Sequence, residues 1–548
     1  MSSVFVQESP RLANTYASHG LLRTYLAWKL GPDRLASIEP QLLELGELAA
    51  GGLFELQRAD RLNEPMLTQW DAWGARIDRI ETTALWKEAE CLAVRLGLTA
   101  IPYDGKEGPW ARTRQFALVY LFHPVTDVYS CPLAMTDGAA RALLDSHNGR
   151  LIDRAVPHLT SRDPTEFWTS GQWMTESTGG SDVGLSRTIA RRDASGVWRL
   201  YGKKWFTSAA TSQMALTLAR PEGNGPGGSG LALFYLETRN ADGSLNGIRV
   251  ERLKDKLGTR KVPTAELSLE GTVAEPVCST TEGTRAIEPM LRITRTWNSV
   301  CAVAFMQHGL ALAQDYAQRR RSFGATLADQ PLHRETLAEL EAETAGAFLL
   351  TFLLVELLGH READLLDEDE TVLLRFLTPI VKLATGRQAV QVVSETLEAF
   401  GGAGYIEDTG IPVLLRDTQV LPIWEGTTNV LSLDALLRTD AQRALAALRK
   451  RIQRATHTAG HGELKTSAAV ALAAVEHASR WRLAVHDRGA LQAGARRFAM
   501  TIARAAQLAL LAEYGLAMQD NAAVLASQDW CRRLRRAGID SIQDETGG

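Results

Sequence analysis

Residues 422–429 read PIWEGTTN, and the interpretation of the rest of the chain depends on this stretch. It places one carboxylate, Glu425, between the bulky Trp424 and the small Gly426. Glycine lets the backbone approach a ligand closely, and the polar residues at 427–429 are suited to begin a helix whose first N–H groups can bind a phosphate. An aromatic neighbour that excludes water should raise the pKa of a carboxyl, as a general base near neutral pH requires. Glu425 is therefore a candidate base. The alternative is an ordinary first-turn acid that complements the helix dipole.

Composition places the chain among ordinary globular proteins. It has 548 residues, of which 45% are hydrophobic and 23% charged, and this length suggests three or four domains. The net charge of −4 gives the whole chain no strong attraction to nucleic acid or membrane. The charge is unevenly distributed, because residues 441–548 carry 16 basic and 9 acidic side chains, a net of +7. A basic C-terminal part is a modest indication of a polyanionic partner.

Cysteine usage and hydropathy indicate a reducing compartment. The five cysteines are far apart and form no CxxC pair, which argues against a disulfide scaffold and a zinc site. No clustered His, Cys and Asp pattern predicts any other metal site. Residues 1–4 lack the basic-then-apolar pattern of an export signal, and the apolar stretch 345–358 is too short to span a bilayer. We therefore expect a cytoplasmic protein without membrane insertion.

The first half of the chain changes from helical to alternating periodicity. Residues 1–40 read as an irregular arm with a short helical piece, punctuated by glycine and proline. Apolar residues then recur at helical spacing, so the part before residue 167 is expected to be all-α, with a short helix at 139–145. Between 173 and 270 the pattern alternates and is rich in turns, which predicts a small β-barrel or sandwich.

The second half reads as long amphipathic helices, as in antiparallel bundles. They are expected at 287–321, 333–360, 371–400, 466–488 and 492–518, with shorter ones at 430–437 and 441–453. A boundary near 439–440 would separate a central bundle from a C-terminal one. The predicted fold class is mainly α with a central β-barrel, in four domains: 1–166, 167–284, 285–440 and 441–548.

Three further stretches could bind a cofactor. Residues 174–183, MTESTGGSDV, offer hydroxyls and exposed backbone N–H groups to a polar ring edge or a phosphate, although an ordinary Ser/Gly loop has the same composition. Residues 202–208, GKKWFTS, place an indole face beside a hydroxyl, which suits a flat heteroaromatic ring as well as a protein core. Three arginines at 319–321 could bind a pyrophosphate or simply complement a helix C-terminus.

Taken together, these pieces resemble the acyl-CoA dehydrogenase family of flavoproteins over about residues 70–440. The motifs that carry the resemblance lie in the family's order: MTESTGGSDV at 174–183, KWFTS at 204–208, LKDKLGTR at 253–260, RRRSFG at 319–324 with Gln330, FGGAGY at 400–405 and WEGTTN at 424–429. The chain is most similar to the AidB-like branch. CPLAMTDG at 131–138, the tryptophan before Glu425 and the extra basic helical domain support that assignment.

The resemblance implies a helical N-terminal domain, a middle β-barrel and a four-helix bundle that together bind FAD. Trp205 would pack against the isoalloxazine ring, and Thr207 would reach its N5 edge. The residues that the resemblance assigns to FAD are Met174, Thr175, Ser181, Trp205, Phe206, Thr207, Arg320, Phe323, Gln330, Gly401, Gly402, Thr427 and Asn429. Contacts to the adenine diphosphate commonly come from a neighbouring subunit in this family, so a homotetramer is implied.

The implied chemistry is α,β-dehydrogenation of an acyl-CoA thioester. Glu425 would take the α-proton while the β-hydrogen leaves as hydride to flavin N5, and the electrons would pass to an electron-transfer flavoprotein. Ser181, Arg295, Trp424 and Gly426 would contact the substrate. The chain departs from the family at Arg292, where many members have an acid three residues before Arg295, so the binding of CoA itself is left open.

A second implication comes from the AidB-like branch, which includes DNA-binding members linked to alkylation damage and with feeble dehydrogenase activity. The basic run RRLRR contains four candidate DNA contacts: Arg532, Arg533, Arg535 and Arg536. The alternative is that these arginines solvate a helix and pair with acids on neighbouring subunits. Binding to phosphates through such a face would weaken steeply with salt.

Overall fold

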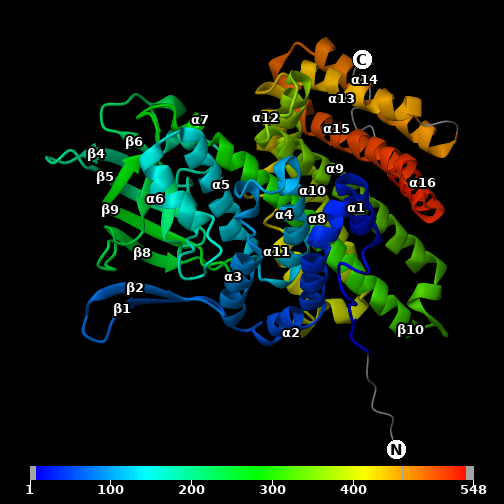
Figure 1. Ribbon diagram of the computed structural model, residues 1–548, viewed down its shortest axis with the longest axis horizontal. Coiled ribbons are helices and arrows are strands. Elements are labelled where there is room, and N and C mark those ends of the chain that lie inside the picture. Colours follow the sequence, from blue (N-terminus) through cyan, green and yellow to red (C-terminus); the bar gives the residue numbers. More distant parts are fainter. Residues whose placement is uncertain (1–7, 459–461, 538–548) are drawn as a thin grey trace, which may run out of the picture. The chain divides into compact units, whose positions relative to one another are not determined.

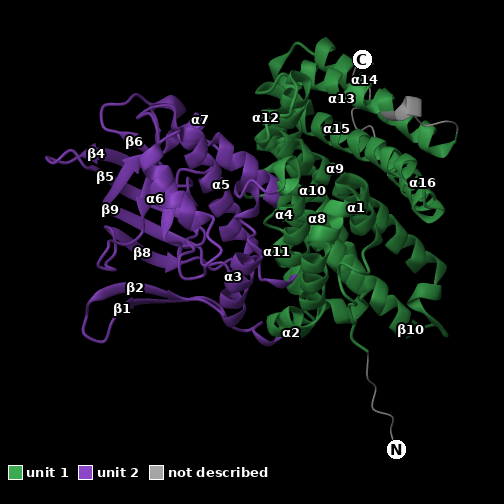
Figure 2. Ribbon diagram, in the orientation of Figure 1, with its two compact units in different colours: residues 1–58, 107–124, 298–548 green, residues 59–106, 125–297 purple. Residues whose placement is uncertain are grey.

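The computed structural model describes residues 8–458 and 462–537 and is mostly helical (61%) with a central β-barrel. The predicted fold class is therefore confirmed. The chain forms two compact units, one of Met1–Arg58, Glu107–Pro124 and Asn298–Gly548 (unit 1) and one of Ala59–Lys106 and Val125–Trp297 (unit 2) (Figure 2). The four predicted domain boundaries remain predictions, and the N-terminal residues from which the absence of an export signal was inferred lie outside the described residues.

Seven strands form the barrel of unit 2 (Figure 1). They are β3 (Ser170–Trp173), β4 (Ile189–Arg192), β5 (Trp198–Thr207), β6 (Met214–Pro221), β7 (Ala232–Glu237), β8 (Ile248–Leu253) and β9 (Ala265–Pro276). The hydrogen-bonded order is β3-β6-β4-β5-β9-β7, with β8 paired to β9, and an additional pairing of β6 with β7 closes the sheet on itself. Alternate residues point inward and form one buried apolar cluster that includes Trp173, Leu200 and Phe234.

The N-terminal region is not all-α, because a β-hairpin interrupts it. Strands β1 (Met66–Trp70) and β2 (Arg76–Glu81) pair antiparallel around a turn at 71–75. Asp71 holds this turn, since its carboxylate accepts hydrogen bonds from the backbone N–H groups of Trp73 and Ala75, both at 2.8 Å. Each strand is only five or six residues long and only partly buried, so its alternation was too brief to outweigh the helical periodicity on both sides.

Three helices and a short helical turn complete unit 2: α3 (Ala84–Leu96), α5 (Ser130–Ser146), α6 (Gly149–Leu159) and α7 (Gly283–Ala286). Helix α5 begins nine residues before the short helix expected at 139–145, so Asp137 lies inside it. The Asp137 carboxylate is fully buried and accepts hydrogen bonds from Trp297 Nε1 at 2.7 Å and from the Tyr103 hydroxyl at 2.6 Å. These contacts explain how a charged residue is accommodated in a buried helix.

Unit 1 consists mainly of helices, one of which, α8, begins in unit 2 and enters unit 1 at Asn298. They are α1 (Gly20–Ala50), α2 (Gly52–Ala59), α4 (Ala111–Phe122), α8 (Glu288–Arg319), α9 (Pro331–Glu362), α10 (Glu368–Ala399), α11 (Ile411–Thr418), α12 (Thr428–Leu437), α13 (Ala441–Thr458), α14 (Glu463–Ala484), α15 (Arg488–Ala517) and α16 (Asn521–Arg536). The long helices expected after residue 285 are confirmed to within a few residues. Helix α1 corrects the expected irregular arm, because the chain is helical from Gly20 onward with only a kink at Gly31.

Helix α9 forms the centre of unit 1. By length and composition, it alone among the described helices could cross a membrane, yet 89% of its apolar window is buried inside the chain. Tyr25 of α1 packs edge-on against Phe348 and Phe352 of α9. Helices α15 and α16 also pack against α9, so the C-terminal helices share its buried surface. These contacts are those of a core helix.

Candidate active site

Glu425 lies on a tight turn directly before α12. Its backbone is in the left-handed region, with φ of 59°, and Gly426 follows with φ of 110°. A Cβ on Gly426 would lie 2.7 Å from Leu431 Cδ2, so glycine is required both by the backbone angle and by the close approach of α12. Helix α12 begins at Thr428, as its sequence predicted, with Thr427 in extended conformation before it. The turn thus leaves a half-buried carboxylate immediately before a helix N-terminus.

Two buried side chains from other helices contact this turn. Lys382 of α10 donates a hydrogen bond to the carbonyl oxygen of Gly426 at 2.7 Å. Asn298 of α8, with its amide oriented to satisfy both neighbours, accepts from Trp424 Nε1 at 2.5 Å and donates to the carbonyl oxygen of Leu421 at 3.2 Å. Neither residue was a sequence candidate. Lys382 could have been noticed, because it is a lone charge within the apolar run PIVKLA at 379–384.

In unit 2, a buried ion pair between Glu176 and Lys204 fixes the loop at 174–183. Glu176 accepts a hydrogen bond from Lys204 Nζ at 2.8 Å, and both side chains are almost completely buried. Ser186, Thr188 and the backbone N–H of Arg187 also donate to this carboxylate. Desolvation raises the pKa of Glu176, but the charge and hydrogen bonds of these neighbours outweigh it and lower the pKa to about 2. The carboxylate is therefore ionised at neutral pH and anchors the loop to β4 and β5.

The part of the same loop at 179–181 is exposed to solvent. Gly179, Gly180 and Ser181 are exposed, and the Thr178 hydroxyl is buried without a hydrogen-bond partner in the described part of the chain. A Cβ on Gly180 would lie 2.6 Å from Thr175 Oγ1, so the loop can fold over Thr175 only with glycine at that position. An unused hydroxyl beside exposed backbone suits a polar ligand such as a flavin edge.

Strand β5 places Trp205 beside this loop. The backbone N–H of Trp205 donates to the carbonyl oxygen of Thr175 at 3.0 Å, which brings two predicted flavin contacts together. Lys254 Nζ lies 3.4 Å from the centroid of the Trp205 ring and 4.6 Å from that of Phe206. The Thr207 hydroxyl is fully buried and donates to the carbonyl oxygen of Ala265 at 2.6 Å, so the side chain is held in the barrel wall.

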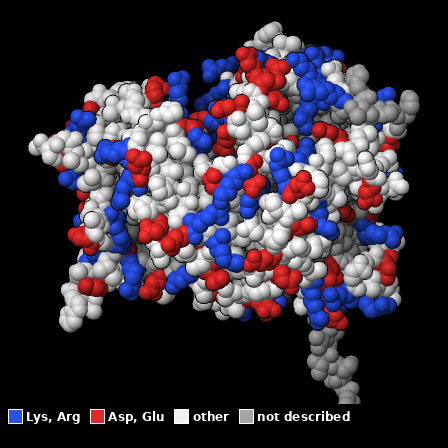
Figure 3. Space-filling view, viewed as in Figure 1, with Lys and Arg blue, Asp and Glu red and all other residues white. Residues whose placement is uncertain are grey.

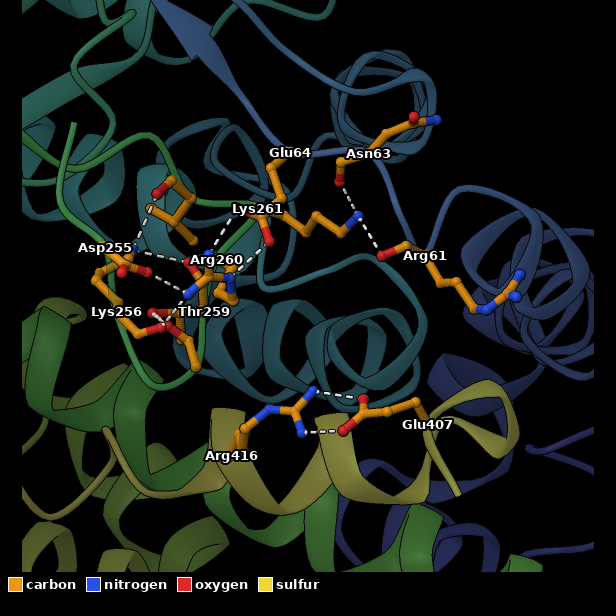
Figure 4. A network of polar contacts seen from close by, with 12 residues as sticks. Arg61, Asn63, Glu64, Asp255, Lys256, Thr259, Arg260, Lys261, Glu407 and Arg416 are labelled. Carbon is orange, nitrogen blue, oxygen red and sulfur yellow. Dashed lines mark hydrogen bonds and ion pairs between the residues drawn. The ribbon is translucent and has the colours of Figure 1, made fainter. Parts of the chain in front are cut away.

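The LKDKLGTR stretch at 253–260 is fixed largely by contacts inside unit 2 (Figure 4). Arg260 binds Glu64 and Asp255, each at 2.6 Å, and Lys256 Nζ donates to the carbonyl oxygens of Thr259 and Val262. The charged residues of this motif therefore shape a loop. In unit 1, the pair of Arg416 with Glu407 similarly ties α11 to the turn before it (Figure 4).

The predicted contacts for the adenine diphosphate lie in unit 1. Phe323 is 99% exposed at the tip of a short hairpin, β10 (Arg321–Ser322) and β11 (Ala325–Thr326), and Gln330 donates to the carbonyl oxygen of Ser322 at 3.1 Å. Gly401 and Gly402 begin an exposed 3-10 turn, and a Cβ on either would meet no atom within 4 Å. Thr427 and Asn429 are exposed at the start of α12. The open backbone at 401–402 leaves room for a bulky ligand.

Family models match three successive parts of the chain. Residues 171–272 match the middle domain and 281–439 the C-terminal domain of acyl-CoA dehydrogenase, and 9–164 match the N-terminal domain of the adaptive response protein AidB. Acyl-CoA dehydrogenase family member 11 of Caenorhabditis elegans is 43% identical over 459 residues, or 82% of this chain and 74% of that protein. The chain belongs to the acyl-CoA dehydrogenase family. It is accordingly an oxidoreductase, and FAD is its cofactor.

Two more relatives place the chain within the family. The putative acyl-CoA dehydrogenase AidB of Escherichia coli is 33% identical over 458 residues, covering 79% of this chain and 80% of that one. The crystal structure of Caenorhabditis elegans ACDH-11 in complex with C11-CoA superimposes with a TM-score of 0.93 at 38% identity, covering 97% of this chain and 93% of that one. The resemblance to the AidB-like branch is confirmed.

Arg292 is ion-paired within its own helix. Its Nη2 lies 2.5 Å from Glu288 Oε2, one turn earlier on α8, and Arg295 is half-buried on the same helix. Among residues 8–458 and 462–537, no group of three or more His, Cys, Asp and Glu side chains could hold a metal ion.

The four arginines of the RRLRR run are all ion-paired within their own chain. Arg533 lies 2.6 Å from Glu335 and 2.8 Å from Asp529, and Arg535 contacts Glu463. Arg532 pairs with Asp529 at 3.4 Å, and Arg536 lies 3.7 Å from Glu335. The expected partners were acids of neighbouring subunits, whereas the carboxylates belong to α9, α14 and α16 of the same chain.

Proposed function

We propose that this protein is an FAD-dependent acyl-CoA dehydrogenase that introduces a double bond between the α and β carbons of an acyl thioester. The observation that carries the proposal is the position of Glu425, a half-buried carboxylate on a strained turn between Trp424 and Gly426. Non-glycine residues with positive φ are uncommon and concentrate where function requires them. The ligand named in the ACDH-11 structure, C11-CoA, supports an acyl-CoA as the substrate class.

In this proposal, Glu425 is the base that removes the α-proton and holds it on its carboxylate. Bound FAD supplies the acceptor for the β-hydrogen, which leaves as hydride. The backbone N–H of Glu425 polarises the thioester carbonyl, which lowers the free energy of the developing negative charge. In this proposal, Trp424 shields the carboxylate from water, as proton abstraction by a positioned base requires.

In the same proposal, the remaining contacts are those that the family resemblance assigns. Thr175, Ser181 and the open backbone at 179–181 bind the flavin edge, and Trp205 packs against its ring. Gly401 and Gly402 accept the pyrophosphate, and Arg320, Phe323 and Gln330 contact the adenine diphosphate. Ser181, Arg295, Trp424 and Gly426 contact the thioester. A homotetramer, a cytoplasmic location and an electron-transfer flavoprotein as the oxidant complete the proposal.

An anaerobic spectral titration tests the function. The purified yellow protein is mixed with straight and branched acyl-CoAs of increasing chain length. Loss of the flavin's visible absorbance with one class is the expected result, and it would also identify the acyl chain. The proposal is contradicted if no thioester reduces a flavin that dithionite does reduce.

Binding to DNA is the second candidate function. The observations that favour it are the net charge of +7 in residues 441–548 and the match to the N-terminal domain of AidB. Its support is weaker, because the RRLRR arginines are neutralised by carboxylates of the same chain. On the face shown in Figure 3, basic and acidic side chains are interspersed. A titration with duplex DNA at low and high salt decides this candidate, since binding through phosphates must weaken with salt.

A further inference from the structure

The turn that carries Glu425 is tied to two helices that lie far from it in sequence. Lys382 of α10 is completely buried, and its ammonium donates to the carbonyl oxygen of Gly426 at 2.7 Å. Burying a charged ammonium is costly unless hydrogen bonds satisfy it, so a hydrophobic residue would be the ordinary choice at this position. Instead, a lysine is present at 382, and its ammonium binds the backbone of Gly426, the residue directly after Glu425.

Asn298 of α8 holds the other side of the same turn. It is 4% exposed, and its amide bonds both the indole Nε1 of Trp424, at 2.5 Å, and the carbonyl oxygen of Leu421, at 3.2 Å. The neighbours of Glu425 on both sides are therefore fixed by buried polar side chains. Helix α10 can approach this closely because residue 386 is glycine, where a Cβ would lie 3.0 Å from the carbonyl oxygen of Leu421.

The backbone between these two anchors is strained. Glu425 has φ of 59° and Gly426 has φ of 110°. Such a conformation in a non-glycine residue persists only where the surrounding structure determines it. A general base must also be held within a fraction of an ångström of its proton, because small misplacements cost large factors in rate.

We propose that Lys382 and Asn298 are positioning residues that hold the Glu425 carboxylate in place for proton abstraction. Lys382 acts through the carbonyl of Gly426, and Asn298 acts through the indole of Trp424. The inference rests on the proposed dehydrogenase function, in which Glu425 is the base. It adds two residues that act on Glu425 through the neighbouring residues of the turn.

A purely structural role is the alternative, in which Lys382 only helps α10 pack against α12. The chain offers a matched control, since Arg375 lies seven residues earlier on α10 and pairs with Asp434 of α12 at 2.8 Å. Arg375→Met therefore weakens the same helix pair while leaving the turn untouched. Lys382→Met removes the ammonium and keeps the aliphatic stem, and Lys382→Gln keeps a hydrogen-bond donor.

The first measurement is hydrogen exchange of backbone amides in the FAD-loaded protein. We expect Lys382→Met to speed exchange in residues 420–431 by roughly 10-fold or more, because local opening of the turn becomes easier. Arg375→Met should leave residues 420–427 unchanged, and Lys382→Gln should restore most of the protection. Unchanged exchange at 420–431 in Lys382→Met would overturn the proposal.

The second measurement is the rate of flavin reduction by saturating acyl-CoA. Lys382→Met should lower it by about 10- to 100-fold, with little change in the acyl-CoA concentration at half-maximal rate. Equal losses in Lys382→Met and Arg375→Met would show a merely structural role. If no acyl-CoA reduces the wild-type flavin, the proposed function fails, and the exchange experiment still decides whether these residues hold the turn.

A double-mutant cycle tests Asn298 separately and does not depend on whether Lys382→Met folds. Asn298→Leu should speed amide exchange at 420–426 and lower the reduction rate by roughly 10-fold. Trp424→Phe removes the indole N–H, which donates a hydrogen bond to the Asn298 side-chain oxygen. The loss caused by Asn298→Leu should shrink when Trp424 is already phenylalanine, because the two side chains share one hydrogen bond. Fully additive losses would contradict the proposed route through Trp424.

Discussion

Lys204 Nζ lies 2.8 Å from Glu176 Oε1, and the two charged side chains are 0% and 4% exposed. The lysine also donates to the carbonyl oxygen of Leu218 at 2.9 Å, and the glutamate accepts from Ser186 and Thr188. The desolvation cost of a buried ion pair is offset only when further hydrogen bonds satisfy both charged groups, as they do here. The pair connects the proposed flavin loop to the barrel.

Removing either partner of this pair should destabilise the protein unequally. Glu176→Gln leaves the Lys204 ammonium buried without a carboxylate and should cost about 3–5 kcal/mol in the free energy of unfolding. Lys204→Met leaves a carboxylate that still accepts several neutral hydrogen bonds, so its cost should be smaller. Urea unfolding of both variants measures the difference. The exposed pair of Arg79 and Glu81 provides the control, and Glu81→Gln should cost less than about 1 kcal/mol.

The same pair predicts a pH dependence of stability. The pKa of Glu176 is lowered from an ordinary 4.5 to about 2 in the folded protein, so the unfolded state binds the proton more readily. Its contribution is therefore fully present above pH 4.5 and is lost as the pH falls toward 2, by about 1.4 kcal/mol per unit at most. The stability difference between wild type and Glu176→Gln should shrink over that range. A difference that stays constant from pH 6 to pH 3 would contradict the assignment.

Substitution of Glu425 should separate cofactor binding from chemistry. Glu425→Gln preserves the shape of the side chain but removes the base, so the protein should stay yellow while acyl-CoA reduces its flavin at least about 1000-fold more slowly. Stopped-flow absorbance measures this rate. Glu425→Asp shortens the reach of the carboxylate, so its rate of flavin reduction should lie between the rates of the wild type and Glu425→Gln. Full activity in Glu425→Gln would remove this residue from the mechanism.

Trp205 should matter for FAD binding in a way that its strand neighbour does not. Trp205→Ala removes the proposed stacking surface and should weaken FAD affinity by roughly 10-fold or more. Tyr201 lies on the same strand and the same side of it, so Tyr201→Ala is the matched control and should leave FAD affinity within about 2-fold. Fluorescence titration of the apoprotein with FAD measures both constants. Equal losses would indicate general damage to β5.

The C-terminal arginines should differ in their effect on stability. Arg533 is 13% exposed and pairs with two carboxylates, so Arg533→Gln should cost about 1–3 kcal/mol. Arg532 is 54% exposed, and Arg532→Gln should cost less than about 0.5 kcal/mol. Urea unfolding distinguishes them. If duplex DNA binds here instead, the double variant Arg532→Gln, Arg536→Gln should reduce the slope of log affinity against log salt by about one to two.

Local sequence patterns were sufficient for most of the fold. Alternation and turn content between 173 and 270 predicted the barrel region, although not each of its strands. Apolar spacing with glycine and proline breaks identified the long helices, because both patterns depend on neighbours within one element. The hairpin at 66–81 and the continuous helix at 20–50 were missed. In the hairpin the alternation is short and half-exposed, and in α1 a kink at Gly31 and two prolines disguise a helix.

The motifs in the sequence were also enough to nominate Glu425, the loop at 174–183 and the β5 tryptophan, since each is carried by consecutive residues. Only the tertiary structure showed that Lys382 and Asn298 form hydrogen bonds with the turn at 421–426. It also showed that Lys204 pairs with Glu176 and that the RRLRR arginines pair with carboxylates of the same chain. The Glu176–Lys204 contact joins residues 28 positions apart, and the Arg533–Glu335 contact joins α16 to α9 across 198 positions. Which side chains meet is set by how helices and strands pack, and no local pattern encodes that.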